Sequence, residues 1–253
     1  MKTKKTLKPW VTNVISILLL AIIGYSGYKI IKIKMDESKT IKIQNEYKLP
    51  NIKNDDASED VESYSEKFNS LKVMNNDFKG WIVFESGLID LPFVQAKDND
   101  FYLRRNFDKE YSSHGSIFQD YSQDLNGRNI TLYGHYVYNN ADIMFTPLST
   151  LKDKNSYEAN KYFSLYLDRE VRKYVIGAVI KYSLTDEPLY QIGDQTDEEF
   201  LQFIKYIDTH KLFDTNEEIN IDDKLVSLQT CIRNEDDSRW LIIGKLVEVN
   251  EIQ

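Results

Sequence analysis

The sequence predicts a mainly β domain, a barrel or sandwich with helical insertions, that follows a single long apolar segment. The first observation is a series of short apolar runs separated by polar clusters with Gly, Asn or Asp, a pattern typical of strands joined by turns. The second is the scarcity of helical spacing, because only a few segments repeat apolar residues every three or four positions. The third is composition: 42% of the 253 residues are hydrophobic, including 17 Tyr and 12 Phe, so a sizeable core is expected.

The apolar segment lies near the N-terminus, where residues 9–28 carry no charge. At about 1.5 Å per residue, a helix of this length crosses a hydrocarbon core of roughly 30 Å. Lysines on both sides of the segment give a mild preference for an N-terminus inside the cell. We predict an uncleaved transmembrane anchor over residues 9–31. A cleaved signal peptide is the alternative, although no small-residue cleavage site of the A-x-A kind ends the segment.

The anchor divides the chain into four parts. Residues 1–8 are expected to be a cytoplasmic N-terminus, residues 9–31 the anchor, and residues 32–57 a polar stalk largely without fixed structure. Residues 58–253 are expected to form the folded domain. Because a second apolar segment of this length does not follow, we expect one crossing of the cell membrane and an extracellular domain.

The first half of the domain is expected to combine one helix with several strands. Ser58 is placed to cap a helix that packs on the domain through one apolar face, formed by Val61, Tyr64, Phe68 and Leu71. A short helical turn is expected after Asp98, and a helix over residues 142–151, although Pro147 lies in its interior. Strands are expected over residues 78–84, 89–94, 115–118, 129–135, 162–167 and 171–183.

The C-terminal part combines a capped helix with two strands that bracket the only cysteine. Thr196 and Glu199 form a capping box before an apolar helical face. Apolar runs at residues 225–228 and 240–247 predict strands on either side of the acidic residues 234–238. Cys231 lies where the first strand ends and Arg239 where the second begins. If the two strands are neighbours, a thiol and a guanidinium project from the same rim of one sheet.

Three side chains form a set suited to acyl transfer. The Cys231 thiolate would attack a carbonyl, His135 would pass a proton to the leaving amine, and Arg239 would stabilise the oxyanion. Each also has a plainer interpretation: a buried cysteine, a histidine that only forms hydrogen bonds, and an arginine paired with surface carboxylates. Arg233 is the alternative guanidinium, because residues i and i+2 of a strand share a face. No carboxylate is clearly placed to orient the imidazole.

The other histidines, the net charge and the cysteine count limit which further sites, partners and cross-links the chain can have. His114 lies in a polar loop and His210 at the end of an expected helix, so both are interpreted as structural. A formal net charge of -8 argues against a nucleic-acid partner. A single cysteine excludes an intrachain disulfide. We expect neither a cofactor nor a metal.

These motifs resemble those of a known family. The segment Leu228-Gln-Thr-Cys231 resembles the T/S-L-x-T-C signature of sortases, with Ser227 at the first place. Leu132-Tyr-Gly-His135 resembles their histidine segment, and Arg239 occupies the position of the arginine that opens the last strand. Residues 78–82, 94–99 and 102–103, and the helix before the cysteine strand, are similar to the class B branch. The resemblance covers the chain from about residue 61 to residue 247.

The resemblance implies a fold and a role. The fold would be an eight-stranded β-barrel with an N-terminal helix and a helix before the catalytic-cysteine strand. Cys231 would be the nucleophile, His135 the general acid/base, and Arg239 the group that binds substrate and oxyanion. The residues implied in substrate binding are Asn99, Leu103, Ser227 and Thr230. The implied partners are secreted proteins of Gram-positive bacteria with a C-terminal sorting motif, loosely N-P-x-T-like, and peptidoglycan or its precursor as the amine acceptor.

Two other functions remain open at this point. Cys231-Ile-Arg233 is similar to the C-x-R of L,D-transpeptidases, which are also cysteine enzymes of the cell wall, but the Ser-x-Gly expected before the cysteine is replaced by Leu228-Gln-Thr230. A membrane-tethered binding domain with a merely buried cysteine is the non-enzymatic alternative. Thiol reactivity of the folded protein separates an enzyme from such a domain, because a buried structural cysteine reacts only after unfolding.

Overall fold

The computed structural model describes residues 8–49, 57–138, 140–183, 195–232 and 235–252. The chain divides into two compact units, Met1–Lys39 and Thr40–Gln253. The first consists of most of helix α1 (Pro9–Glu46), and the second contains the last turns of α1 together with the β domain.

Helix α1 is the one described helix that is long and apolar enough to cross a membrane. A signal sequence would pass the same test of length and composition. The stalk was expected to lack fixed structure, but residues 35–46 continue the helix. In the second unit, Thr40, Gln44 and Tyr47 are buried polar or aromatic side chains, so tertiary packing stabilises helical turns that the polar sequence alone does not predict.

The eight described strands form a closed barrel, as the sequence resemblance implied. Around the barrel they follow the order β1-β2-β3-β4-β7-β8-β6-β5. The β2–β3 and β4–β7 pairs are parallel and the other pairs are antiparallel. The strands are β1 (Phe78–Phe84), β2 (Asp90–Val94), β3 (Ile117–Gln119), β4 (Asn129–Tyr133), β5 (Tyr162–Tyr166), β6 (Glu170–Ser183), β7 (Leu225–Ile232) and β8 (Glu235–Glu251).

The barrel encloses the main hydrophobic core. Inward-facing side chains of the strands meet there, among them Ile82, Phe93, Leu132, Leu228 and Ile242. The core is closed at one side by the 3-10 helix η2 (Thr146–Lys152), whose Leu148 and Leu151 are fully buried. Because side chains alternate across each strand, the residues between these face outward. They pack under the helices or reach solvent.

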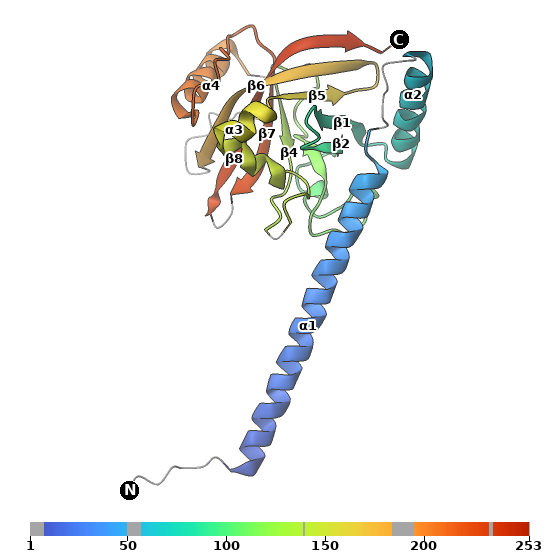
Figure 1. The fold of residues 1–253 in the computed structure, drawn as a ribbon, viewed down its shortest axis with the longest axis vertical. Coiled ribbons are helices and arrows are strands. Elements are labelled where there is room, and N and C mark those ends of the chain that lie inside the picture. Colours follow the sequence, from blue (N-terminus) through green and yellow to red (C-terminus); the bar gives the residue numbers. More distant parts are fainter. Residues whose placement is uncertain (1–7, 50–56, 139, 184–194, 233–234, 253) are drawn as a thin grey trace. The chain divides into compact units, whose positions relative to one another are not determined.

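Two helices cover the outer face of the barrel. Helix α2 (Ala57–Met74) packs beside β1 in an aromatic cluster that includes Tyr64, Phe68 and Trp81. Helix α4 (Asp197–His210) packs beside β6 (Figure 1), with Phe200 and Phe203 against the outer side of the sheet. The Thr196–Glu199 capping box is confirmed, since the Thr196 side chain accepts from the Glu199 amide and the Glu199 side chain accepts from the Thr196 amide.

The short helices differ from the sequence expectation. The helix expected over residues 142–151 begins only at Thr146, with Pro147 in its first turn. Backbone N–H groups in a first turn have no partner within the helix, so the missing N–H of proline costs no hydrogen bond there. Helix α3 (Lys154–Ala159) was not expected; its N-terminus is capped by Asp153, whose carboxylate accepts from two backbone amides. The turn after Asp98 is confirmed as the 3-10 helix η1 (Phe101–Leu103).

The last two strands are longer than expected. β7 runs one residue past Cys231, and β8 begins at Glu235, within the acidic segment expected to be a loop. The start of β8 pairs with β7 through Ile232–Glu235, and from Ser238 onward β8 also pairs with the long strand β6. Arg233, the alternative guanidinium, lies outside the described residues.

Candidate active site

The strand order brings the predicted reactive residues together. β7 is flanked by β4 on one side and β8 on the other. In the antiparallel β7–β8 pair, Cys231 lies directly opposite Arg239. Opposed residues of such a pair have their side chains on the same face, with Cβ atoms about 4.5–5.5 Å apart. The thiol and the guanidinium therefore leave the sheet side by side.

His135 reaches the same rim from β4. The parallel β4–β7 register places Tyr133 beside Gln229, and the Gly134 amide donates to the Gln229 carbonyl at 3.1 Å. Continuing this register sets His135 level with Cys231. Gly134 makes the approach possible, because a Cβ on it would lie 2.6 Å from the Phe145 ring and 2.5 Å from Ile117.

One pocket of about 390 Å³ contains all three side chains. Of the residues implied in substrate binding, Asn99, Leu103 and Thr230 also line it, and Ser227 does not. Ser227 is fully buried in the middle of β7, where its hydroxyl donates to Asn129 Oδ1 at 2.9 Å. That placement does not favour a substrate contact for Ser227.

The His135 imidazole is half-buried and has a defined partner. Its Nε2 lies 2.8 Å from the backbone carbonyl oxygen of Leu103. The pKa of His135 is lowered from its usual value, first because burial disfavours the charged ring, and further because Arg104 and His114 add positive charge nearby. The hydrogen bond to Leu103 acts on this pKa in the opposite direction.

The other two members of the set are also partly buried. Cys231 is a free thiol. The Arg239 guanidinium donates through Nη1 to the carbonyl of Ser238 at 2.9 Å, so the end of its side chain folds back toward the strand. Thr230, next to the thiol, is 2% exposed, and its hydroxyl has no hydrogen-bond partner among the described residues. A buried hydroxyl without a partner is uncommon and costly, so a substrate group is a suitable acceptor or donor for it.

A buried carboxylate that the sequence analysis missed organises one wall of the pocket. Asp120 is 0% exposed, and its Oδ2 accepts from Asn99 Nδ2 at 2.7 Å and from the Tyr133 hydroxyl at 3.0 Å. Asn99 Oδ1 in turn accepts from the Tyr121 amide. One Asn99 N–H therefore remains for a substrate. The sequence signal that could have identified Asp120 is an aspartate two residues before a serine at a strand end. Here the Ser122 amide donates to the Asp120 carboxylate and forms an Asx turn.

The two histidines interpreted as structural lie outside the pocket lining. His114 is buried, with Nδ1 3.1 Å from the Thr40 hydroxyl. His210 ends α4, where Nδ1 lies 2.9 Å from the Tyr206 carbonyl and the ring stacks on that of Tyr206. Both arrangements agree with the structural interpretation.

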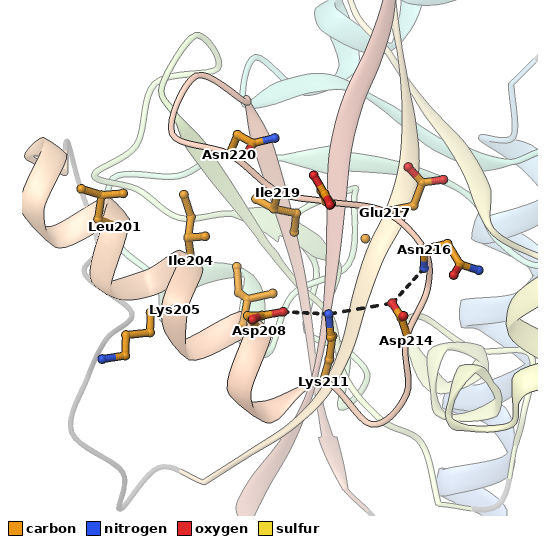
Figure 2. Close-up of a pocket in the computed structure, with 13 residues that line it drawn as sticks. Leu201, Ile204, Lys205, Asp208, Lys211, Asp214, Asn216, Glu217, Ile219 and Asn220 are labelled. Carbon is orange, nitrogen blue, oxygen red and sulfur yellow. Dashed lines mark hydrogen bonds and ion pairs between the residues drawn. The ribbon is translucent and has the colours of Figure 1, made fainter.

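A larger pocket lies elsewhere on the β domain. It has a volume of about 780 Å³ and is lined by α4 and by residues that follow it (Figure 2). Its best-defined interactions are ion pairs of Lys211 with Asp208 at 2.7 Å and with Asp214 at 3.9 Å. Neither a thiol nor an imidazole is among its lining residues. The smaller pocket is therefore the one equipped for acyl transfer.

Comparison with known proteins gives the family. No family model matches the chain. The chain is 27% identical over 247 residues to Sortase B of Staphylococcus aureus, covering 94% of this chain and 97% of that protein. It is 28% identical over 250 residues to Sortase B of Listeria monocytogenes, covering 95% and 98%.

Solved structures agree with the curated relatives. The X-ray structure of a mutant form of Clostridium perfringens sortase B superposes with a TM-score of 0.70 and 33% sequence identity, covering 75% of this chain and 90% of that one. Sortase B from Bacillus anthracis gives a TM-score of 0.69 at 26% identity and covers 85% of this chain. Barrel, pocket and relatives lead to the same conclusion: the chain belongs to the class B sortases, a family of cysteine transpeptidases.

Proposed function

We propose that this sortase is anchored in the cell membrane and cleaves a C-terminal sorting motif of secreted proteins through a thioacyl intermediate on Cys231. The acyl group is then transferred to an amine of peptidoglycan or its precursor. The observation that carries the proposal is the pairing of Cys231 with Arg239 across β7 and β8, in the same pocket as His135.

The acylation step uses the side chains of Cys231, Arg239 and His135 in turn. The Cys231 thiolate attacks the carbonyl carbon of the scissile peptide bond, and the electron pair of the C=O bond moves to oxygen. Arg239 donates hydrogen bonds to that oxyanion, where a preorganised cation stabilises the developing charge. The His135 imidazolium gives its proton to the amide nitrogen, the C–N bond breaks, and the amine product leaves. A thioester on Cys231 remains.

The transfer step reverses these roles. The acceptor amine attacks the thioester carbon, and His135 takes one proton from the attacking nitrogen. The C–S bond breaks as the new amide forms, and the thiolate returns to Cys231. Transfer to the amine is favoured over hydrolysis when the amine occupies the space beside the thioester in the partly buried pocket, because water is then excluded from that space.

Substrate binding is assigned to residues around the thiol. Thr230 is suited to the oxyanion or the adjacent substrate carbonyl, because its buried hydroxyl has no other partner among the described residues. Asn99 and Leu103 line the same pocket and would contact the sorting motif, for which an N-P-x-T-like sequence is proposed. Ser227 is the exception, because it faces Asn129 inside the barrel wall.

The membrane part of the proposal rests on α1. Residues 9–31 are proposed as the anchor, residues 1–8 as the cytoplasmic end, and the β domain as extracellular. The length and apolar composition of α1 support this assignment. In place of a stalk over residues 32–57 and a domain over residues 58–253, the catalytic domain is proposed to begin near Thr40, because Thr40–Gln253 forms one compact unit.

Cleavage of peptides tests the proposal. The protein is incubated with a panel of fluorogenic sorting peptides, with and without an amine such as triglycine, and the products are identified by mass spectrometry. We expect cleavage of an N-P-x-T-like peptide and an added mass on the protein that maps to Cys231. Cys231→Ala should abolish both while keeping the melting temperature, since one small side chain replaces another at a strand end. Cleavage by that variant would exclude the covalent mechanism.

A further inference from the structure

The hydrogen bond between His135 and Leu103 identifies the tautomer of the catalytic imidazole. Nε2 lies 2.8 Å from a backbone carbonyl oxygen, which accepts hydrogen bonds and cannot donate them. Nε2 must therefore carry a proton. A neutral imidazole has one N–H, so the other nitrogen, Nδ1, presents a lone pair. When the ring is an imidazolium, Nε2 keeps the proton that it donates to the carbonyl, and Nδ1 holds the exchangeable one.

The Leu103 carbonyl is held by the turn that contains it. Asp98 Oδ1 accepts from the amides of Asp100 at 2.9 Å and Phe101 at 2.8 Å. The Leu103 amide donates to the Asp100 carbonyl at 3.2 Å, which closes η1. These bonds leave the Leu103 carbonyl directed out of the turn and toward the imidazole.

A second segment supports the same turn from behind. Residues 112–116 pack on η1, where the Ser116 amide donates to the Tyr102 carbonyl at 3.1 Å and the Ser112 amide to the Arg104 carbonyl at 3.0 Å. Gly115 lies between these contacts with a φ of +61°. A Cβ on Gly115 would lie 2.5 Å from the Tyr102 oxygen and 2.9 Å from the Leu103 oxygen, closer than real Cβ atoms approach backbone.

We propose that the Leu103 carbonyl, which packs against Gly115, is the positioning group of the reaction. It holds His135 in the Nε2–H tautomer. Nδ1 is then the nitrogen that exchanges protons with the thiol and the substrate amine. The inference deepens the proposed function and rests on His135 being its acid and base. A backbone carbonyl thereby does what a side-chain carboxylate does in a Ser-His-Asp triad, which is to fix the ring's tautomer and orientation.

With the Nε2–H tautomer, Nδ1 gives one proton in acylation and takes one proton back in transfer. In acylation, Nδ1–H transfers its proton to the leaving nitrogen as the C–N bond breaks, and the ring becomes neutral with its remaining proton on Nε2. In transfer, Nδ1 accepts one proton from the attacking amine, and the imidazolium is restored. The Nε2–H bond to Leu103 is unbroken throughout. No rotation of the ring is needed between the two steps.

Gly115→Ala tests the support, and Gly87→Ala is its matched control. Gly87 also has a left-handed φ, +79°, but a Cβ there would meet nothing within 4 Å. Both substitutions carry the backbone strain, and only the first displaces the Leu103 carbonyl. The full chain is produced with ¹⁵N-labelled histidine in detergent micelles, and long-range ¹H–¹⁵N spectra are recorded above the pKa of His135. The His135→Gln variant assigns its signals among the three histidines.

In the wild-type and Gly87→Ala proteins we expect a protonated Nε2 and an unprotonated Nδ1. Gly115→Ala should give mixed tautomers and a kcat lower by roughly 10²-fold, the usual cost of misplacing a reacting group by about 1 Å. A wild-type spectrum with the proton on Nδ1 would overturn the inference, whatever Gly115→Ala does, including failure to fold. An unchanged spectrum and rate in folded Gly115→Ala would also overturn it.

The same measurements separate this inference from the proposed function. If His135→Gln retained cleavage, the assignment of His135 as acid and base would fail, and with it the inference, even where the wild-type tautomer is Nε2–H. If His135→Gln abolished cleavage but the wild-type ring carried its proton on Nδ1, the proposed function would stand and only the positioning role of Leu103 and Gly115 would fall.

Discussion

At the residue scale, Arg239 owes its place to strand pairing. It lies across from Cys231 in the β7–β8 ladder, whereas Arg233 lies outside the described residues. Removing a donor aimed at the oxyanion costs roughly 10²–10³ in turnover. We therefore expect Arg239→Ala to lower kcat by that amount, and Arg239→Lys to be poor as well, because lysine keeps the charge but loses the planar fork.

Arg233→Ala is the matched comparison for this prediction and should stay near the wild-type rate, because the proposal gives Arg233 no role at the oxyanion. Steady-state kinetics on the same sorting peptide measure all three variants. Normal activity of Arg239→Ala together with a large loss in Arg233→Ala would assign the oxyanion to Arg233 instead.

The pKa of His135 gives a second residue-scale prediction. Burial lowers it, and Arg104 and His114 lower it further, so NMR titration should show a midpoint below the ordinary value of about 6.5. Removing a neighbouring positive charge in Arg104→Gln should raise that midpoint. A midpoint that stays in place, or falls, in Arg104→Gln would contradict this account of the shift.

The effect of His135 on the pH dependence of stability is set by how many protons the folded and unfolded chains bind. Below about pH 6.5 the unfolded chain, with its ordinary histidine pKa, binds more protons than the folded one. The contribution of His135 to stability is therefore present above that pH and is lost as pH falls through the folded-state pKa. Chemical denaturation of wild type and His135→Gln across this range should show a smaller acid loss in the variant.

Asp120 gives a third prediction, on substrate affinity. Its carboxylate accepts from both Asn99 and Tyr133, which line the pocket. Asp120→Asn removes the charge while keeping the shape, so both side chains lose a charge-assisted partner. We expect KM for the sorting peptide to rise about tenfold, equivalent to about 1.4 kcal/mol and near the lower bound for a hydrogen bond to a charged group.

Asp124→Asn controls for the loss of a carboxylate nearby. Asp124 Oδ1 accepts from the exposed Asn126 amide, and Asp124 does not line the pocket. The KM of this variant should match that of the wild type. Equal KM values in the Asp120→Asn and wild-type enzymes would show that Asp120 does not organise the substrate wall.

At the element scale, the segment after α1 belongs to the folded β domain. Tyr47 is 4% exposed and packs against Phe107, with ring centroids 4.8 Å apart. Its hydroxyl donates to Asp108 at 2.8 Å, and its carbonyl accepts from the Trp81 indole at 2.7 Å. Truncating a buried aromatic side chain to alanine costs about 3–5 kcal/mol.

We therefore expect Tyr47→Ala to lower the free energy of unfolding by several kcal/mol, measured by urea denaturation of the full chain in micelles. Tyr111→Ala is the control, because Tyr111 is 68% exposed and its loss should change stability little. Similar stability of the two variants would mean that residues near 47 are dispensable, as the sequence expectation of an unstructured stalk implied.

At the scale of the whole molecule, the proposed topology places the catalytic pocket outside the cell. Protease added to intact protoplasts should then digest the β domain or the segment before it, detected by immunoblot against a C-terminal tag. A tagged cytoplasmic protein in the same cells should stay intact. Full protection of the sortase until the membrane is permeabilised would mean that the orientation is reversed.

Much of the fold was accessible from sequence because it depends on local pattern. Alternating apolar runs predicted most strands, the capping box predicted the start of α4, and Cys231, His135 and Arg239 stood out by chemistry and spacing. The placement of those three in one pocket agrees with the sequence hypothesis. Their individual roles remain predictions until the variants are measured.

What the tertiary structure decided depends on partners far away in the chain. The helical end of α1 is stabilised by packing, and pairing with β6 extends β8 back to Ser238; neither contact lies within a local window of sequence. Asp120 acquired a role only because Asn99 and Tyr133 fold onto it. The group that orients His135 is a backbone carbonyl, and since every residue has one, the sequence alone could not single out Leu103.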